Sequence, residues 1–168
     1  MAEQQGSLQL STDDRFQRAE WFAQRVGWAL WIAVIIAAGL GLLGPGWLSD
    51  RRLTAADGAL TLDYERFVHY HNPSQLEVTF EGAPNAANQW TLLLGKPLLD
   101  RMQILRIEPE PVHQEVRANG ASYTFAATAD AAGGRVVFHV EYQRYGEVKG
   151  SVALREGTPL RFSQFVYP

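Results

Sequence analysis

The sequence predicts a membrane-anchored all-β protein, in which one transmembrane helix precedes a soluble domain built as a two-sheet β-sandwich. Three observations predict this class. A block of 23 residues carries no charged side chain. The sequence after it alternates apolar and polar residues in short runs, as half-buried strands do, and turn residues separate these runs.

Four segments follow from these patterns. Residues 1–11 are expected to be a flexible polar N-terminus, residues 12–48 a helix that includes a transmembrane span at 26–48, residues 49–58 a linker, and residues 59–168 the β domain. A domain of roughly 110 residues can bury a hydrophobic core without disulfides or bound metals. Because the chain has no cysteine, disulfides, cysteine zinc sites and thiol nucleophiles are excluded.

The transmembrane span reads VGWALWIAVIIAAGLGLLGPGWL, which exceeds the roughly 20 residues needed to cross a bilayer. Trp28 and Trp31 lie toward one end and Trp47 toward the other, where tryptophan rings prefer the headgroup level. A cleaved signal peptide has a shorter apolar region, of about 7 to 15 residues. A buried core helix would need a larger domain to cover it on all sides.

Small residues recur at every fourth position of the span, at Ala29, Ala33, Ala37 and Gly41. They form one ridge along which another helix could approach closely. This ridge predicts pairing with a membrane-protein partner or a homodimer through the helix. The alternative is that alanine and glycine are simply frequent in membrane helices.

The membrane orientation is nearly balanced by charge, since three arginines precede the span and Arg51, Arg52 and Arg66 follow it. An uncleaved signal-anchor followed by a secreted β domain is the commonest use of this layout. We therefore expect a single-pass protein with a cytoplasmic N-terminus and the β domain on the periplasmic or extracellular side.

The β domain is predicted from alternation and turn residues, without a convincing amphipathic helix. Strands are expected near residues 60–65, 76–81, 121–127, 136–142, 148–155 and 160–167. The stretch 90–107 is ambiguous, and its pattern resembles strands at 90–94 and 104–107 with a turn or short helix at 97–102 between them. In strand count and size this domain resembles an immunoglobulin-like or fibronectin-like sandwich. It lacks the cysteine-tryptophan-cysteine pattern of true immunoglobulin domains, so no functional residue is carried over. A partly closed barrel is the alternative.

Little in the sequence indicates chemistry. His69 and His71 are the best candidate metal ligands, because residues two apart on a strand share a face; the simpler interpretation is two solvent-facing histidines before a turn. No catalytic triad, phosphate loop or cofactor motif is present. The net charge of −3 argues against a nucleic-acid partner.

The C-terminal run from Arg161 to Pro168 is rich in aromatic residues. Phe165 and Tyr167 would project from one face of a last strand, whose open edge could accept a partner's strand. The simpler interpretation is an ordinary last strand with both faces covered. The sequence therefore predicts a non-catalytic accessory or interaction protein held in the lipid bilayer. A membrane-tethered metal-binding or catalytic domain that uses His69 and His71 is the alternative.

Overall fold

The computed structural model describes residues 14–40, 49–127, 133–155 and 157–168 of the chain. The chain divides into two compact units, with the boundary in the sequence between Ala37 and Ala38. The first is an apolar N-terminal helix, and the second is an all-β domain with two sheets.

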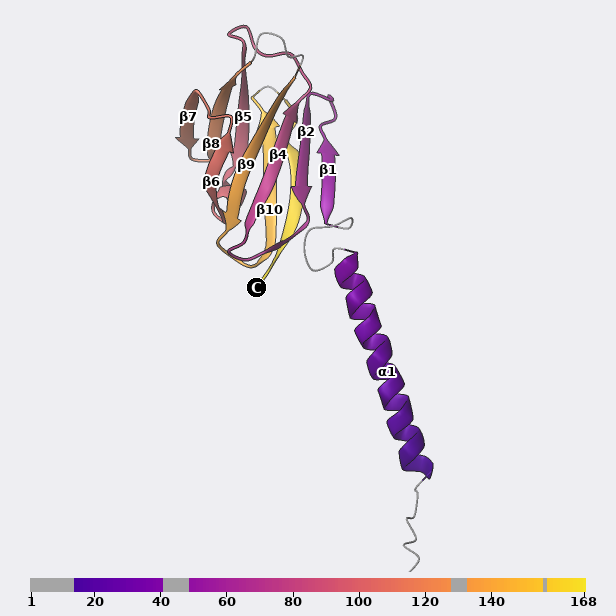
Figure 1. Ribbon diagram of the computed structural model, residues 1–168. Coiled ribbons are helices and arrows are strands. Elements are labelled where there is room, and N and C mark those ends of the chain that lie inside the picture. The colour runs from indigo at the N-terminus through magenta and orange to yellow at the C-terminus, as the bar shows by residue number, and fades with distance from the viewer. Residues whose placement is uncertain (1–13, 41–48, 128–132, 156) are drawn as a thin grey trace, which may run out of the picture. The chain divides into compact units, whose positions relative to one another are not determined.

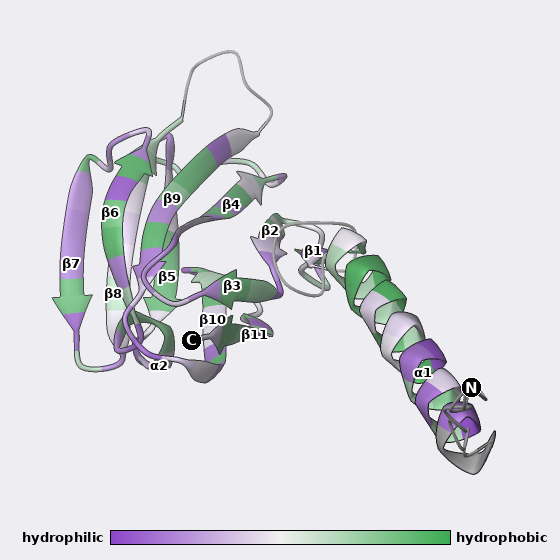
Figure 2. Cartoon of the chain, turned by 60° about the horizontal axis from the view of Figure 1, so that its bottom comes forward, coloured by the Kyte–Doolittle hydropathy of each residue, from purple (hydrophilic) through white to green (hydrophobic). Residues whose placement is uncertain are grey.

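The helix α1 (Asp14–Gly39) contains 26 residues. Its part from Gln17 to Gly39 is long and apolar enough, by length and composition alone, to cross a membrane, and none of its most apolar window is buried. Trp28, Trp31 and Ile35 are 66%, 68% and 65% exposed. Figure 2 shows apolar residues toward the C-terminal part of α1 and polar residues toward its N-terminal part. An exposed apolar surface of this length needs a nonaqueous or protein environment to cover it.

The predicted span extends further along the chain than the described part of α1. Described helical structure ends at Gly39, with a turn at Leu40. Gly41 and Trp47, which the sequence marks as a helix-packing residue and an interface anchor, lie outside the described residues.

The described part of the second unit contains eleven strands and one short helix. Their bounds are β1 (Asp50–Thr54), β2 (Leu60–Glu65), β3 (Phe67–His69), β4 (Pro73–Phe80), β5 (Gln89–Gly95), α2 (Lys96–Leu99), β6 (Met102–Glu108), β7 (His113–Arg117), β8 (Gly120–Ala126), β9 (Gly134–Tyr142), β10 (Gly146–Leu154) and β11 (Leu160–Tyr167).

The strands form two layers, which Figure 1 shows one behind the other. The five-stranded sheet has the order β1-β2-β4-β9-β6, and the six-stranded sheet has the order β3-β11-β10-β5-β8-β7. Neighbouring strands are antiparallel except for β3 and β11, which are parallel. The antiparallel alternation places one side of each strand in the core and the other side in solvent.

The core lies between the two sheets and is dominated by aromatic and branched side chains. The ring of Phe80 on β4 stacks on Trp90 of β5 with centroids 5.2 Å apart, and Tyr123 of β8 meets Phe138 of β9 edge to face at 5.5 Å. All four rings are at most 5% exposed. Because each pair joins one sheet to the other, these contacts hold the sandwich together.

One polar network crosses this core. The Tyr142 hydroxyl of β9 donates to the Gln164 side-chain oxygen of β11, and the Gln164 amide nitrogen donates to the Glu65 carbonyl at 2.6 Å. Tyr142 and Gln164 are 0% and 1% exposed. Each buried polar group of this network therefore has a hydrogen-bond partner in the opposite sheet.

Three strands arise where the sequence pattern did not predict them. β1 lies within residues 49–58, which were expected to be a linker, and it carries Asp50, Arg51 and Arg52. β3 has only three residues, and all five residues of β7 are exposed. Because β1, β3 and β7 are edge strands, they lack the apolar alternation by which buried strands are recognised, and edge strands commonly carry charges or stay short.

Candidate functional site

The outward side of the five-stranded sheet is a continuous polar surface, which we call the polar face. It is formed by the residues that alternate with the core positions of β1, β2, β4, β9 and β6. These residues are Asp50, Arg52, Thr54, Thr61, Asp63, Glu65, Gln75, Glu77, Thr79, Arg135, Val137, His139, Glu141, Gln103, Arg106 and Glu108. Val137 is apolar, as are Pro73, which pairs in register with Glu141, and Leu105, which lies at the β6 bulge and is 48% exposed. Polar and charged side chains therefore make up most of this face.

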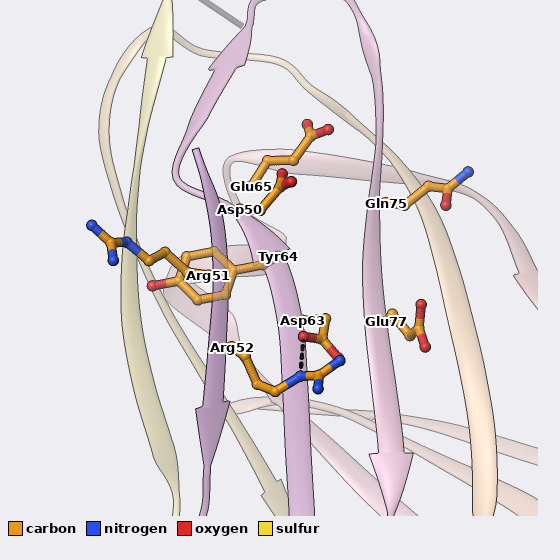
Figure 3. A pocket seen from close by; sticks show the side chains of 8 residues that line it. All are labelled: Asp50, Arg51, Arg52, Asp63, Tyr64, Glu65, Gln75 and Glu77. Carbon is orange, nitrogen blue, oxygen red and sulfur yellow. Dashed lines mark hydrogen bonds and ion pairs between the residues drawn. The ribbon is translucent and has the colours of Figure 1, made fainter. Parts of the chain in front are cut away.

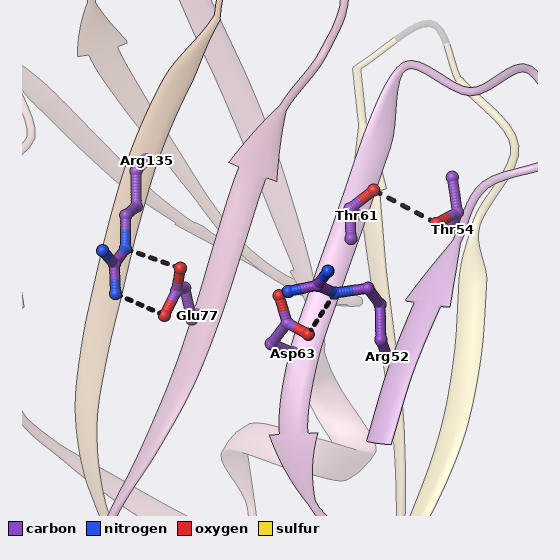
Figure 4. Close-up of polar contacts among 6 residues, drawn as sticks. All are labelled: Arg52, Thr54, Thr61, Asp63, Glu77 and Arg135. Carbon is purple, nitrogen blue, oxygen red and sulfur yellow. Dashed lines mark hydrogen bonds and ion pairs between the residues drawn. The ribbon is translucent and has the colours of Figure 1, made fainter. Parts of the chain in front are cut away.

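Two carboxylates lie opposite each other at the centre of the polar face. Asp63 on β2 pairs in register with Glu77 on β4, an arrangement that is destabilising for two like charges unless cations offset it. Arg52 Nε lies 2.7 Å from Asp63 Oδ1, and Arg135 Nη2 lies 2.6 Å from Glu77 Oε2 (Figure 4). The hydrogen bond to Asp63 raises the pKa of the Arg52 guanidinium above its usual value. The two carboxylates and the two guanidinium groups therefore neutralise one another, with Arg52 on one side of the carboxylate pair and Arg135 on the other.

The end of the polar face beside the start of β1 is acidic. Asp50 and Glu65 are paired in register, and Glu65 accepts a hydrogen bond from Ser74 Oγ at 3.0 Å. An open groove of about 470 Å³ runs along this region, lined by Asp50, Arg51, Arg52, Asp63, Tyr64, Glu65, Gln75 and Glu77 (Figure 3). It is lined by four acids and two arginines.

The groove is shallow and charged rather than deep and apolar. Figure 3 shows Arg52 turned toward Asp63, whereas Arg51 extends away from it beside the Tyr64 ring. Small-molecule sites are typically concave and mostly apolar, so this groove is better suited to the surface of another protein. Its acidic excess favours a partner that presents basic side chains.

The four histidines occupy separate places. His69 ends β3, with its ring 5.9 Å from Tyr167. His71 follows in the turn with a positive φ of 56°, and its Nδ1 lies 3.0 Å from Glu141 Oε1. His113 begins the exposed strand β7.

His139 lies on the polar face with 31% of its side chain exposed, as its alternation with core residues predicts. Its Nε2 is 4.0 Å from Glu108 Oε2 and makes no hydrogen bond within the described structure. Among the residues that the structure describes, no group of three or more histidine, cysteine, aspartate and glutamate side chains could hold a metal ion. His69 and His71 thus remain metal candidates from the sequence pattern alone.

Phe165 and Tyr167 lie on the outward side of the six-stranded sheet, but their stretch of β11 is not an open edge. β3 pairs with it in parallel, with Phe165 opposite Phe67 and Tyr167 opposite His69. The edge-strand docking that the sequence suggested at these residues is therefore corrected, because a short strand that the pattern missed occupies that edge. The outward aromatic rings remain accessible, and Phe165 is 43% exposed.

The described small residues of the helix ridge, Ala29, Ala33 and Ala37, lie one turn apart on α1. A neighbouring shallow groove on α1 is lined by Gln24, Gly27, Trp28, Trp31 and Ile35. Arg25 lies over the Trp21 ring at 3.5 Å from its centroid. This pair places a cation and an aromatic ring in the stretch that directly precedes the uncharged block.

No protein-family model matches the chain, and no curated protein matches it. Among solved structures, the chain is similar to a cohesin module from a Clostridium perfringens ATCC13124 family 33 glycoside hydrolase. The sequence identity is 9% and the TM-score is 0.44, and the match covers 68% of this chain and 98% of that chain.

Proposed function

We propose that this chain is a single-pass, membrane-anchored interaction protein without catalytic activity. The observation that carries the proposal is α1, in which 23 consecutive residues from Gln17 to Gly39 form a helix apolar enough to cross a membrane with no burial of its most apolar window. The all-β domain has its own complete core, so it does not need α1 for burial. Lipid is the simplest environment that covers such a helix.

The β domain, in this proposal, presents the polar face to a protein partner on the outer side of the membrane. The acidic groove over β1, β2 and β4 supports a partner with a basic surface, and its open shape supports recognition rather than catalysis. The ridge of Ala29, Ala33 and Ala37 supports close packing of α1 against another helix, either of a membrane protein or of a second copy. For the metal-binding alternative, the described residues contain no group of three or more side chains, with His69 and His71 among them, that could hold a metal ion.

The first test is the location and composition of the native assembly. The tagged chain should stay in the membrane fraction after carbonate washing, and should co-purify in stoichiometric amount with another membrane or envelope protein after gentle detergent extraction. Release by carbonate would contradict the anchor. A lone monomer would contradict the partner.

A matched pair of variants tests the polar face. Asp63→Lys breaks the exposed pair with Arg52, whereas Glu115→Lys breaks a comparable exposed pair with Arg117 on β7, away from this face. Both changes should leave stability nearly unchanged, because exposed ion pairs contribute little to it. Asp63→Lys should reduce co-purification of the partner at least tenfold, and Glu115→Lys should leave it unchanged. Equal recovery with both variants would exclude the polar face as the binding surface.

A further inference from the structure

Aromatic side chains from three separate parts of the sequence gather at one end of the β domain. The Tyr167 ring lies 5.9 Å from Phe67 and 5.1 Å from Phe165, and the Tyr70 ring lies 6.4 Å from Tyr145, between centroids. The Tyr70 amide also donates to the Tyr167 carbonyl at 2.8 Å, which joins the two groups. We call these five residues the aromatic patch.

The aromatic patch is accessible although its residues belong to a packed domain. Tyr70, Tyr145 and Phe165 are 40%, 69% and 43% exposed. Single exposed aromatic residues are ordinary on a protein surface, but a contiguous group usually marks a binding surface. Three of its members are tyrosines, whose rings carry an apolar body and a polar hydroxyl.

Cations accompany the aromatic patch. Arg66 has its guanidinium carbon 5.4 Å from the centroid of the Phe67 ring, and Arg144 precedes Tyr145; both arginines are exposed. The nearby acid Glu147, which pairs in register with Phe165, has Lys149 within 3.8 Å. Exposed tyrosines beside arginines that form no ion pair within the described part of the chain match the chemistry of a lipid headgroup layer, where amphipathic rings and cations meet phosphate.

The place where the chain enters the β domain lies next to this patch. Ser49 Oγ donates to the Phe67 carbonyl at 3.1 Å and accepts from the Phe67 amide at 3.2 Å, and the Arg66 amide donates to the Ser49 carbonyl at 2.6 Å. Ser49 is fully buried by these contacts. In the sequence it directly follows the proposed transmembrane span, residues 26–48.

We propose that the aromatic patch rests in the headgroup layer of the membrane that α1 crosses, and so fixes the orientation of the β domain on the lipid surface. This inference rests on the proposed membrane anchor, because the entry residue Ser49 brings Phe67 and its neighbours to the bilayer only if the preceding residues span it. The polar face, on the other sheet, is then left free for a protein partner.

The test uses the full chain in vesicles of phosphatidylcholine and phosphatidylglycerol. Because the chain contains no cysteine, one introduced cysteine carries a single environment-sensitive fluorophore. Tyr145→Cys labels the patch, and Ala86→Cys labels an exposed position in the β4–β5 connection at the other end of β4. Ile35→Cys reports insertion of α1. Quenching is measured with lipids that carry a nitroxide on the headgroup or deep in the acyl chain.

The headgroup nitroxide should quench the label at Tyr145→Cys at least threefold more than the label at Ala86→Cys. Replacing Tyr70 and Phe165 by serine should remove that difference. Deep quenching at Ile35→Cys with equal headgroup quenching at the other two positions overturns the patch inference and leaves the anchor intact. Absence of deep quenching at Ile35→Cys, together with failure of the chain to float with the vesicles, overturns both.

Discussion

Among the residues that the structure describes, Tyr142 is the one whose ionisation depends most strongly on the folded state. Burial raises the pKa of the Tyr142 hydroxyl far above its usual value. The unfolded chain releases this proton above about pH 10, whereas the folded chain retains it. Because the folded state then binds more protons, the Tyr142 contribution to stability is present below pH 10 and is lost as the pH rises above it.

Replacing Tyr142 by phenylalanine is expected to lower the free energy of unfolding at pH 7 by about 1–3 kcal/mol, since the buried Gln164 side-chain oxygen loses its donor. Above about pH 10, stability of the parent chain should fall more steeply than that of the variant, by up to about 1.4 kcal/mol per pH unit. Urea unfolding of the full chain in detergent, followed by circular dichroism, measures both quantities.

The control for this change is Tyr145→Phe, which removes a hydroxyl from a ring that is 69% exposed. It should alter the free energy of unfolding by less than about 0.5 kcal/mol, both at pH 7 and above about pH 10. If the stabilities of the parent chain and of Tyr142→Phe depend on pH in the same way, the steeper loss of stability above about pH 10 cannot be assigned to Tyr142.

The same network shows where prediction from sequence ends at the residue scale. Alternation around Phe162 and Val166 places Gln164 on the inward side of β11, so its burial follows from the pattern. Its partners do not, because Tyr142 is 22 residues away and the Glu65 carbonyl is 99 residues away. A strand pattern specifies which side faces the core, but not which opposite residue satisfies a polar group there.

At the scale of elements, the central strands were predicted well, whereas three of the four edge strands were not predicted. β4, β5, β9, β10 and β11 bury every second side chain, whereas β2 and β8 begin with consecutive buried residues. The sequence pattern located all seven strands, although it left the stretch that contains β5 ambiguous. β1, β3 and β7 are held by hydrogen bonds to one neighbour and bury little. The two sheets were therefore predictable, whereas the parallel β3–β11 pairing that builds the aromatic patch was not.

The helix α1 carries a prediction of its own through its small-residue ridge. Ala33→Leu and Ala37→Leu, made together, should abolish any association that α1 forms with another helix, because leucine side chains keep the two backbones apart. Ala38→Leu adds the same bulk about 100° around the helix and should leave the association intact. The association of α1 with a second copy is measured by energy transfer between labelled chains in bilayers, and its association with another protein by recovery of that partner.

Persistence of the association in the double variant would exclude this ridge as the contact. The exposed tryptophans of the neighbouring groove, Trp28 and Trp31, would then be the next surface to test, since they are 66% and 68% exposed on α1. Loss with Ala38→Leu as well would indicate that the contact is not confined to one face.

At the scale of the whole molecule, the partners available to the polar face and to the aromatic patch depend on the side of the membrane on which the β domain lies. Arginines near the span count three on each side, at Arg15, Arg18 and Arg25 before it and at Arg51, Arg52 and Arg66 after it. The positive-inside rule is thus close to balance. Long domains translocate largely regardless of their own charge, so the β domain itself does not oppose export.

We expect the β domain outside and the N-terminus in the cytoplasm, as for an uncleaved signal-anchor. Single cysteines at Ser7 and Ala86, in a chain that has no other thiol, allow a direct check with a membrane-impermeant maleimide on intact cells. Ala86→Cys should react at once, and Ser7→Cys only after permeabilisation. The reverse pattern would turn the polar face toward cytoplasmic partners and the aromatic patch toward the cytoplasmic leaflet. The more negative surface potential of that leaflet would then strengthen the contribution of Arg66 and Arg144 to lipid contact.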